Sequence, residues 1–536
     1  MQQKISIKLS PLNAADNAAI VESIAKAAGK RVEQISGYNL IKRSIDARGK
    51  TVWISLTVNA FINEPFHKRN LQQFNFKDVN NSSKKVVIIG GGPAGIFAAL
   101  QLIENGIKPI ILERGKEVRA RRRDLAVLNK EGIINPESNY CFGEGGAGTY
   151  SDGKLYTRST KRGDVNRILN LFVHFGADEN ILSDAHPHIG TNKLPAIITG
   201  MRTRILECGG EFHFGKKVVD FILEKNEIKA VKTGDGDVLS AGSFILATGH
   251  SATDIFTLLH EKYIEITAKG FALGVRIEHP QELINTIQYG QQYSETNLLP
   301  PASYSLVEQV EGRGVFSFCM CPGGIIAPAS TSESGLVVNG WSPSKRNNPF
   351  ANSGMVVQVE MEDVIKYNLA QKNKSKSNLN SPLLMMDFQK EVEQKAFEIG
   401  GGKFVAPAQR MVDFTEERLS STLPKCSYLP GIEPALLKDV LPPFINRRLK
   451  SAFKLFAKKM PAKNNHHGYF TNEAVLVATE SRTSSPVRIP RDEKLLHHPQ
   501  IKNLFPCGEG AGYAGGIVSA AMDGERVALA CVLIEN

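Results

Sequence analysis

Hydrophobic and polar positions alternate at the start of the chain and then change to a helical spacing. Residues 5–9 place an apolar side chain at every second position, which is typical of a strand with one buried face. Residues 20–29 carry apolar side chains on one helical side and end on a glycine that is placed to close the helix. A hairpin pattern follows over residues 38–61. This strand, helix, strand, strand order predicts a small α+β module over residues 1–62.

The pattern changes after a polar, asparagine-rich stretch, residues 63–83, which is predicted to be a linker. The next segment has the order strand, glycine turn, helix, strand, which predicts a parallel sheet with crossover helices. Mixed strands and long loops then dominate, before the α/β character returns near the end of the chain. The predicted fold class is therefore α/β. A nucleotide-binding domain in two parts, residues 84–270 and 471–536, surrounds an inserted α+β domain, residues 271–470.

The stretch VVIIGGGPAG contains the first chemical signal. Gly90, Gly92 and Gly95 have the G-x-G-x-x-G spacing of a dinucleotide-binding turn between a strand and a helix. The start of such a helix presents free N–H groups and a positive dipole end to phosphates. Glu113 ends the next apolar strand, where a carboxylate accepts the hydroxyls of an adenosine ribose. The stretch predicts a dinucleotide site.

The C-terminal stretch FPCGEGAGYAGGIVSAAMDG indicates which dinucleotide binds. A flavin extends beyond its pyrophosphate, so a second segment has to hold its ribityl chain and ring. Glu509 is placed to accept from ribityl hydroxyls, and a helix that begins near Gly516 and Ile517 is placed at the pyrimidine end of the flavin. The turn ILATG, residues 245–249, adds a third strand-to-glycine junction. These segments favour FAD over a nicotinamide.

Composition and charge narrow the class of protein. The chain is 42% hydrophobic and 22% charged, as in ordinary globular proteins. The sequence shows no signal-peptide core and no apolar run long enough for a membrane span. Its seven cysteines are scattered, as in proteins with reduced thiols, so the protein is expected to be cytoplasmic. The net charge of +11 suits an anionic cofactor, but it also attracts nucleic acid. No RNP, KH or zinc-finger pattern supports nucleic-acid binding, which stays open as an alternative.

At this level of detail the sequence resembles a known family. The motifs that carry the resemblance are GGGPAG, LERG, FGEGGAGTYSDGKL, HIGT, ATGHS, GVRIEHP, SFCMCPGG, NGWSPSKRNNPFANSG, APAQR and CGEGAGYAGGI, spread over nearly the whole chain. They are similar to those of the FAD-dependent (NAD(FAD)-utilising) dehydrogenases, which are distantly similar to geranylgeranyl reductases. The resemblance implies bound FAD and a split, Rossmann-like FAD domain of glutathione-reductase type. It also implies an inserted substrate domain that faces the flavin ring.

Two further segments give cofactor candidates. The glycines of FGEGGAGTYSDGKL let the backbone approach a flat ligand closely. In similar flavoproteins the matching loop borders the flavin ring, which makes Ser151 and Lys154 candidates near its polar edge. The basic run RGKEVRARRRD places Arg121 within reach of FAD phosphates, although a solvated basic helix face explains the run equally well.

The predicted cofactor-binding residues are Gly90, Gly92, Pro93, Ala94, Gly95, Glu113, Arg114, Arg121, Gly145, Gly146, Ser151, Lys154, Ala247, Thr248, Gly249, Gly508, Glu509, Gly515, Gly516 and Ile517.

No catalytic residue stands out from the sequence, and no metal site is expected. Cys319 and Cys321 are two apart, so a strand would place both on one face as a redox pair or as inert thiols. His188 is a candidate proton donor or anion anchor, with a surface histidine as the alternative. Arg410 is a candidate clamp for a substrate carboxylate or phosphate.

The predicted function is that of an FAD-dependent oxidoreductase, a dehydrogenase or reductase that transfers hydride or electrons through a non-covalently bound flavin. Its small-molecule substrate is not indicated by the sequence, and NAD(P)H is a candidate electron donor. Two alternatives remain. One is an NAD-dependent dehydrogenase without flavin, and the other is a flavin-containing, RNA-associated protein whose front module binds nucleic acid through the basic hairpin tip IKRSIDARGK.

Overall fold

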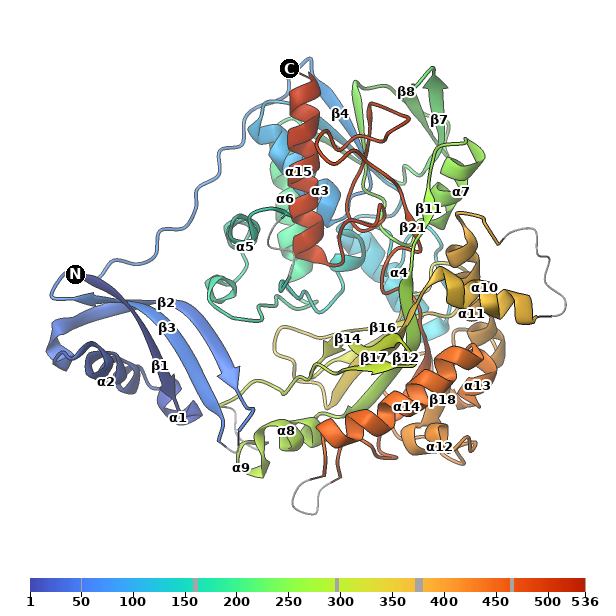
Figure 1. The fold of residues 1–536 in the computed structure, drawn as a ribbon. Coiled ribbons are helices and arrows are strands. Elements are labelled where there is room, and N and C mark those ends of the chain that lie inside the picture. Colours follow the sequence, from blue (N-terminus) through green and yellow to red (C-terminus); the bar gives the residue numbers. More distant parts are fainter. Residues whose placement is uncertain (50, 158–161, 295–297, 372–378, 463–466, 536) are drawn as a thin grey trace.

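The computed structural model describes residues 1–49, 51–157, 162–294, 298–371, 379–462 and 467–535. Figure 1 shows a small module at the N-terminus, a body built on a parallel sheet, and a second, larger sheet below that body. Across the described part of the chain, no helix combines the length and the apolar character needed to cross a membrane.

The N-terminal module is an antiparallel sheet of three strands with a helix packed on one face. Its strand order is β1-β3-β2, formed by β1 (Gln2–Leu9), β2 (Ile35–Asp46) and β3 (Trp53–Ile62). The short α1 (Pro11–Ala14) and then α2 (Asn17–Ala28) follow β1. Ile5, Ile7 and Leu9 are buried, as the alternation in the sequence predicts. Gly29 ends α2 with a φ of 64°, in the left-handed region that glycine adopts without strain.

The segment from residue 63 to residue 84 connects the module to the parallel sheet without forming a helix or strand. Figure 1 shows it as an extended connection. The module also touches the body directly. The backbone N–H of Arg43 donates to the Ser183 carbonyl at 2.8 Å, and the Ala185 N–H donates to the Arg43 carbonyl at 2.9 Å. The edge of β2 is therefore held against residues 183–185.

The central sheet of the body has five parallel strands. Its order is β22-β10-β4-β5-β6, formed by β4 (Lys85–Ile89), β5 (Lys108–Glu113), β6 (Glu211–Phe214), β10 (Ser243–Leu246) and β22 (Leu504–Pro506). The edge strand β22 comes from near the end of the chain, whereas the other four come from its first half. The sheet is therefore built from two distant stretches of sequence.

Different elements cover the two faces of this sheet. Val86 and Ile88 of β4 point into a core with helices on the other side, whereas Val87 and Ile89 point into a separate core. The helices of the first face are α3 (Pro93–Glu104), α5 (Val165–His174), α6 (Leu194–Glu207) and α15 (Ile517–Glu535). The second face packs on the antiparallel strands β7 (Val218–Glu224), β8 (Glu227–Thr233) and β9 (Val238–Leu239) and on α7 (Thr253–Glu261). Figure 1 shows α3, α6 and α15 side by side.

The second sheet has seven strands in the order β13-β14-β17-β12-β20-β18-β19. Neighbouring strands are antiparallel except for the parallel pair β18 and β19. The strands are β12 (Phe271–Pro280), β13 (Val307–Val310), β14 (Arg313–Cys321), β17 (Phe350–Val359), β18 (Ala406–Arg410), β19 (Ile432–Pro434) and β20 (Val475–Glu480). Helices α8 (Gln281–Tyr289), α11 (Leu384–Ile399) and α14 (Pro443–Lys459) pack against this sheet.

The position of β20 differs from the predicted domain boundary. We expected the chain to return to the nucleotide domain at residue 471, but β20 lies in the interior of the seven-stranded sheet, between β12 and β18. Its residues are all buried, and a fully buried strand is a continuous apolar run whether its sheet is parallel or mixed. The return to the first body therefore comes after β20.

Smaller elements complete the structure. A two-stranded sheet joins β15 (Ile325–Pro328) to β16 (Val338–Trp341), and another joins β11 (Thr267–Ala268) to β21 (Val487–Arg488). The basic helix α4 (Val118–Glu131) follows β5. The remaining α-helices of the described residues are α9 (Gln291–Ser294), α10 (Met361–Ala370), α12 (Met411–Thr415) and α13 (Leu437–Val440).

Candidate functional site

A cavity opens at the carboxyl ends of the parallel strands, between the first turns of α3 and α15. Ile89 at the end of β4, Leu112 in β5 and Ala247 just after β10 all line it. Counted together with the open space at its mouth, the cavity has a volume of about 1370 Å³. In open α/β sheets, ligands bind at this edge.

Most of the predicted cofactor residues line this cavity. Those that do are Gly90, Gly92, Pro93, Ala94, Glu113, Arg114, Gly146, Ser151, Ala247, Thr248, Gly249, Glu509, Gly515, Gly516 and Ile517. Gly95, Arg121, Gly145, Lys154 and Gly508 are not on its wall. Predicted segments that are distant in the sequence therefore meet around one space.

The glycine turn before α3 is shaped by close backbone contacts. Gly90 has a φ of 109°, and a Cβ there would lie 2.4 Å from the Ala247 carbonyl oxygen. A Cβ at Gly95 would lie 2.0 Å from the carbonyl oxygen of Gly90. Gly92 differs, because its φ is −81° and a Cβ there would come no closer than 3.9 Å to Gly146 Cα. Gly90 and Gly95 are needed by the fold, whereas Gly92 keeps the cavity side of the turn open.

Glu113 organises the backbone around the turn. Its Oε2 accepts a hydrogen bond from Gly91 N–H at 2.8 Å, and its Oε1 accepts from Gly115 N–H at 2.8 Å and from Gly143 N–H at 2.9 Å. The sequence predicted that this carboxylate binds ribose hydroxyls. The structure adds that it ties three glycine-rich segments together. Each carboxylate oxygen has two lone pairs, so Glu113 retains some acceptor capacity toward the cavity.

Arg114 forms the neighbouring part of the wall. Its guanidinium pairs with Glu137 at 2.6 Å and with Asp254 at 3.0 Å, and lies 4.1 Å from the centre of the Phe142 ring. These contacts fix the side chain while it lines the cavity.

Arg121 does not reach the cavity, so the prediction that it binds FAD phosphates is wrong for this structure. The side chain is fully buried below the glycine-rich loop. Its guanidinium donates to the backbone carbonyls of Asn139, Tyr140, Glu144 and Gly146 at 2.8–3.0 Å. All of its donor nitrogens are used inside the protein, and they hold the loop in shape.

The glycine-rich loop packs directly on the turn before α3. Gly145 has a φ of 76°, and its N–H donates to the Gly91 carbonyl at 2.8 Å. Gly146 lies beside Gly92, and Ser151 donates its hydroxyl to the Gly148 carbonyl at 2.7 Å. Gly145 therefore supports the cavity from behind, whereas Gly146 and Ser151 are on its wall.

The C-terminal turn supplies the opposite wall. Gly508 is behind the wall, where its N–H donates to Asp523 Oδ2 at 2.7 Å, and Arg491 holds the same carboxylate at 2.6 Å. Glu509 lines the cavity, with Oε2 3.6 Å from His250 Nδ1. A Cβ at Gly515 or Gly516 would meet no atom within 4 Å. The start of α15 therefore presents bare backbone to the cavity.

A second, smaller cavity adjoins the first. With its mouth it encloses about 700 Å³. The residues that line both cavities are Cys141, Ala147, Ser151, His250, Cys319, Asn339 and Arg482. The wall of the smaller cavity also includes Tyr140, Tyr150, Asp152, Lys154, Cys321 and Trp341. Lys154, predicted to be near the flavin, is thus on the wall of the smaller cavity.

Cys319 and Cys321 do not share one face of a regular strand. The register of β14 against β17 shifts between Phe318 and Cys321, and Cys319 has a φ of 45°. As a result the side chain of Cys319 is exposed and lines both cavities, whereas Cys321 is buried. Both thiols are free. The bulge breaks the two-residue alternation that the prediction assumed.

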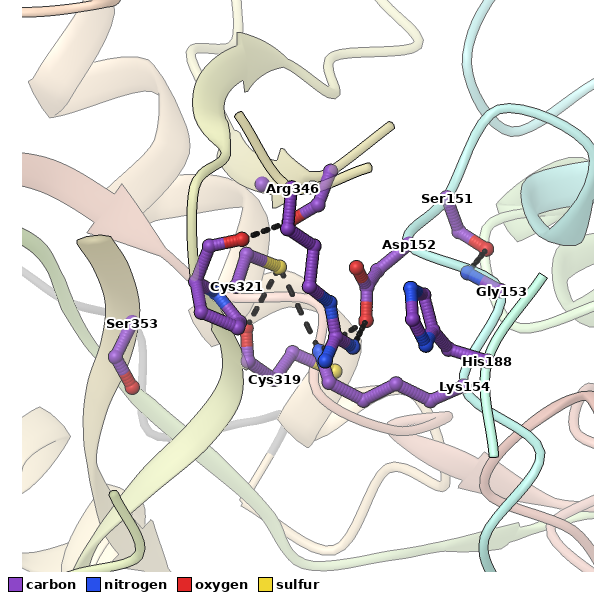
Figure 2. A network of polar contacts seen from close by, with 12 residues as sticks. Ser151, Asp152, Gly153, Lys154, His188, Cys319, Cys321, Arg346 and Ser353 are labelled. Atoms are coloured by element: carbon purple, nitrogen blue, oxygen red, sulfur yellow. Dashed lines mark hydrogen bonds and ion pairs between the residues drawn. The ribbon is translucent and has the colours of Figure 1, made fainter. Parts of the chain in front are cut away.

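A polar network lies beside these cysteines (Figure 2). Asp152 Oδ2 is 3.1 Å from both Lys154 Nζ and Arg346 Nη2. Lys154 Nζ also donates to Cys321 Sγ at 3.6 Å. Although burial raises the pKa of Asp152, the nearby Lys154 and Arg346 outweigh it and lower this pKa to about 2. Asp152 is therefore ionised at neutral pH.

His188 lies next to this network and contacts it through the backbone of Lys154. Its backbone pairs with that of Lys154 in an isolated β-bridge, and its ring Nε2 lies 3.2 Å from the Ser344 carbonyl oxygen. Burial, together with Arg346, lowers the pKa of His188. The ring is on the wall of neither cavity, so the structure gives His188 a supporting place.

Arg410 lies in a different part of the molecule from the two cavities. Its guanidinium donates to the backbone carbonyls of Thr422 at 2.6 Å and Asn472 at 2.5 Å. It lines a separate, smaller pocket next to Glu278 and His279. Arg410 lines neither of the two cavities described above, so its role as a clamp for a substrate carboxylate or phosphate stays a prediction.

Several residues of the main cavity wall were not predicted from the sequence. They include Phe142, Lys217, His250, Asp254, Asn339 and Arg482. Phe142, His250 and Asn339 belong to motifs that were recognised as whole segments, so the signal was present. Lys217, Asp254 and Arg482 lie outside those motifs, and only the fold brings them to the cavity.

No three His, Cys, Asp or Glu side chains form a metal-binding group within the described ranges. The cavity has the features that FAD requires. Its walls contain two helix starts, and bare backbone at Gly92, Gly515 and Gly516 leaves room for phosphates and a flat ring. The residues present therefore fit the cofactor.

Comparisons with known proteins agree with this fit. Residues 83–131 match the family model "FAD binding domain", and residues 270–483 match "FAD-dependent protein, C-terminal domain-like". Residues 1–61 match a domain of unknown function. A protein of Clostridium beijerinckii with the name "Uncharacterized protein" is 38% identical over 547 residues, which covers 98% of each chain. Thiamine thiazole synthase of Methanococcus vannielii is 27% identical over 32% of this chain and 59% of its own.

Similar solved structures include flavoenzymes. Glycine oxidase from Bacillus cereus covers 85% of this chain and 96% of its own at 12% identity and a TM-score of 0.29. L-Proline dehydrogenase from P. horikoshii covers 83% of this chain and 92% of its own at 11% identity and a TM-score of 0.32. At such low TM-scores, no property of these enzymes is carried over to this chain.

The protein is thus a flavin-dependent enzyme of mixed α/β fold, an oxidoreductase in the broad sense that includes monooxygenases, and its cofactor is FAD. More particularly, the chain belongs to the same family of FAD-dependent proteins as the Clostridium beijerinckii protein. The alternative of an NAD-dependent dehydrogenase without flavin does not agree with these matches.

Proposed function

We propose that the protein is a dehydrogenase or reductase that passes hydride or electrons through a non-covalently bound FAD. The observation that carries the proposal is the position of two helix starts. Pro93 at the start of α3 and Ile517 at the start of α15 line one cavity, although most of the chain separates them. A flavin dinucleotide is long enough to contact both.

The two sides of the main cavity bind different parts of the cofactor. Gly90 and Gly92 admit the pyrophosphate to the start of α3, where the helix dipole stabilises negative charge. Glu113 and Arg114 are at the adenosine side. Glu509 is placed for ribityl hydroxyls, and the backbone of Gly516 and Ile517 for the pyrimidine edge of the ring.

FAD held by these residues would supply the transfer of hydride or electrons between a donor and an acceptor. The chain itself binds and orients the cofactor and limits the access of water to the ring. The first turn of α15 stabilises negative charge at the edge of the ring that it faces. The seven-stranded sheet contributes Cys319 from β14 to the opposite wall, and the two-stranded sheet contributes Asn339 from β16.

The domain arrangement that we propose is a split, Rossmann-like FAD domain of glutathione-reductase type with an inserted substrate domain. Its support is the five-stranded parallel sheet, in which β22 returns from the C-terminal end of the chain. A distant relation to geranylgeranyl reductases remains a prediction from sequence motifs. Of the G-x-G-x-x-G patterns among the described residues, only that of Gly90, Gly92 and Gly95 begins directly after a strand and ends inside the following helix, so NAD(P)H, if it is the donor, docks against the flavin rather than in a second nucleotide domain.

The test of the proposal is anaerobic reduction of the purified, flavin-containing protein. NADH and NADPH are added separately, and the loss of oxidised-flavin absorbance is followed. Candidate acceptors are then screened for reoxidation in the absence of oxygen. A dehydrogenase or reductase is expected to be reoxidised by an organic acceptor or redox partner. A separate reduced sample is then exposed to air. If its flavin reacts rapidly only with oxygen and inserts oxygen into a substrate, the enzyme is a monooxygenase and this proposal fails.

A further inference from the structure

Asp152, Lys154 and Arg346 form a polar corner of the smaller cavity, which contains one more cation than carboxylate. Lys154 and Arg346 share a single oxygen of Asp152, each at 3.1 Å. The other buried cations nearby have carboxylates of their own. Arg276 pairs with Glu480 at 2.9 Å, and Arg482 pairs with Glu393 at 2.9 Å. Among the described residues, one positive charge in this corner therefore has no carboxylate of its own.

Lys154 is the cation that a ligand reaches. Its side chain lines the cavity and remains 36% exposed, whereas that of Arg346 is 15% exposed and is not on the cavity wall. An ammonium group has three N–H donors, and two contacts are found for them among the described residues, to Asp152 and to Cys321. Although burial acts to lower the pKa of Lys154, Cys321 and Asp152 raise it overall, so the ammonium stays charged at neutral pH.

In the part of the chain that the structure describes, the carboxylate of the polar corner also lacks a hydrogen-bond partner at one of its oxygens. Asp152 is 3% exposed, yet its Oδ1 has no hydrogen-bond partner among the described residues. Buried carboxylate oxygens are usually hydrogen-bonded, and an ordered water or a polar group of a ligand is the kind of partner that this oxygen lacks.

The rest of the wall is suited to a flat molecule. Tyr140, Tyr150 and Trp341 are on the wall of the smaller cavity. Aromatic side chains stack on planar groups. The residues shared with the main cavity, among them Ser151 and Cys319, are at the junction of the two spaces. A molecule that is bound in the smaller cavity is therefore next to the flavin side of the main one.

From these observations we propose that the smaller cavity is the substrate site, and that it takes a planar organic carboxylate whose negative group pairs with Lys154. The inference rests on the proposed function, because it assumes that the main cavity holds FAD. The carboxylate supplies the missing counter-charge at Lys154, and the planar part lies between the aromatic wall and the junction.

The test uses the flavin-containing full chain with two probes of equal shape, cinnamate and cinnamamide. Binding is followed by calorimetry and by the change that it causes in the flavin absorbance spectrum. We expect cinnamate to bind at least about 10-fold more tightly than the neutral amide, because a hydrogen bond between charged groups contributes about 1.5–3 kcal/mol. Lys154→Met is expected to remove this preference, whereas Lys154→Arg keeps most of it.

The matched control is Lys116→Met. Lys116 also pairs with an aspartate, Asp124 at 2.8 Å, but it lines neither cavity, so this variant changes net charge equally without changing the site. Equal binding of the two probes, or a preference that survives in Lys154→Met, overturns the inference. Loss of flavin in Lys154→Met overturns it too, because Lys154 then serves the cofactor. If the wild-type protein binds no flavin, this result contradicts the proposed function instead. Calorimetry then still measures whether cinnamate binds more tightly than cinnamamide.

Discussion

Glu278 is a buried carboxyl group whose ionisation costs stability. It lies at the end of β12 and is 1% exposed. Its Oε1 accepts from Ser427 N–H at 2.7 Å, and its Oε2 accepts from the Ser427 hydroxyl. Burial raises its pKa from 4.5 to about 7, and these hydrogen bonds offset only part of the rise. Removal from water therefore outweighs hydrogen bonding at this residue.

This shift predicts how stability depends on pH. Between pH 4.5 and 7 the folded protein holds the Glu278 proton more tightly than the unfolded chain does, so stability falls as the pH rises through this window. The full cost above pH 7 is on the order of 3 kcal/mol. We expect Glu278→Gln, which cannot ionise, to gain about 2–3 kcal/mol relative to wild type between pH 5 and pH 8. Urea unfolding at both pH values measures the difference.

The control for this prediction is Glu473→Gln. Glu473 lines the same small pocket as Glu278 but is exposed. Its replacement is expected to leave the pH dependence unchanged. If Glu278→Gln and wild type respond to pH in parallel, the buried carboxyl does not have the raised pKa described here.

At the scale of helices and strands, the contact between α3 and α15 positions both sides of the main cavity. Gly524 of α15 lies against the backbone of Ala94 in α3, where a Cβ would be 2.1 Å from the Ala94 carbonyl oxygen. Ala94 and Ile517 of these two helices line the cavity. Close packing at Gly524 therefore controls how near the two helix starts are.

We expect Gly524→Ala to separate the two helices, because the carbonyl oxygen belongs to a rigid backbone. The predicted loss of stability is about 1–3 kcal/mol, with weaker retention of flavin on dilution. Gly200→Ala in α6 is the matched control, since a Cβ there meets only Phe175 Cδ1 at 3.7 Å. That variant is expected to be neutral or up to about 1 kcal/mol more stable. Tight flavin binding in a fully stable Gly524→Ala protein would show that the helices do not need this contact.

Sequence patterns predicted these elements unevenly, for a physical reason. The roles of Gly90 and Gly95 could be predicted from the sequence, because local backbone geometry alone requires glycine there. The role of Arg121 could not be predicted, because a basic run has the same sequence whether its arginines bind phosphates or, as here, loop carbonyls. The bulge at Cys319 was also missed, because it depends on pairing with β17, which lies about 30 residues further along the chain.

At the scale of the whole molecule, the strand, helix and turn patterns were enough to predict a mixed α/β fold with an FAD-binding domain. They were not enough to predict which sheet contains β20. β20 is as apolar as a strand of the parallel sheet, and only its partners, β12 and β18, assign it to the seven-stranded sheet. Long-range pairing of this kind leaves no local signal in a single sequence.

The N-terminal module stands apart from both cavities. No residue within the described part of 1–62 lines either cavity. We therefore expect a chain without residues 1–62 to keep its full flavin content and absorbance spectrum. Loss of flavin on this deletion would mean that the module supports the site through its contact at Arg43.

The same deletion addresses the alternative of nucleic-acid binding. At the hairpin tip, Arg48 is paired with Asp46 at 2.8 Å, which neutralises part of the basic cluster. A gel shift with RNA at low salt that disappears on deletion of residues 1–62 would favour an RNA-binding module. The absence of any shift with the full chain at low salt would remove this alternative.

The most direct test of the account is the flavin content of Gly92→Val. A Cβ at Gly92 meets no protein atom closer than 3.9 Å, and its φ of −81° suits any residue, so the variant is expected to fold. Its branched side chain would nevertheless occupy the place through which a pyrophosphate approaches α3. We predict that purified Gly92→Val carries little FAD, whereas wild type and the control Gly200→Val carry about one per chain. Full flavin occupancy in a folded Gly92→Val protein would contradict the assignment of this cavity as the FAD site.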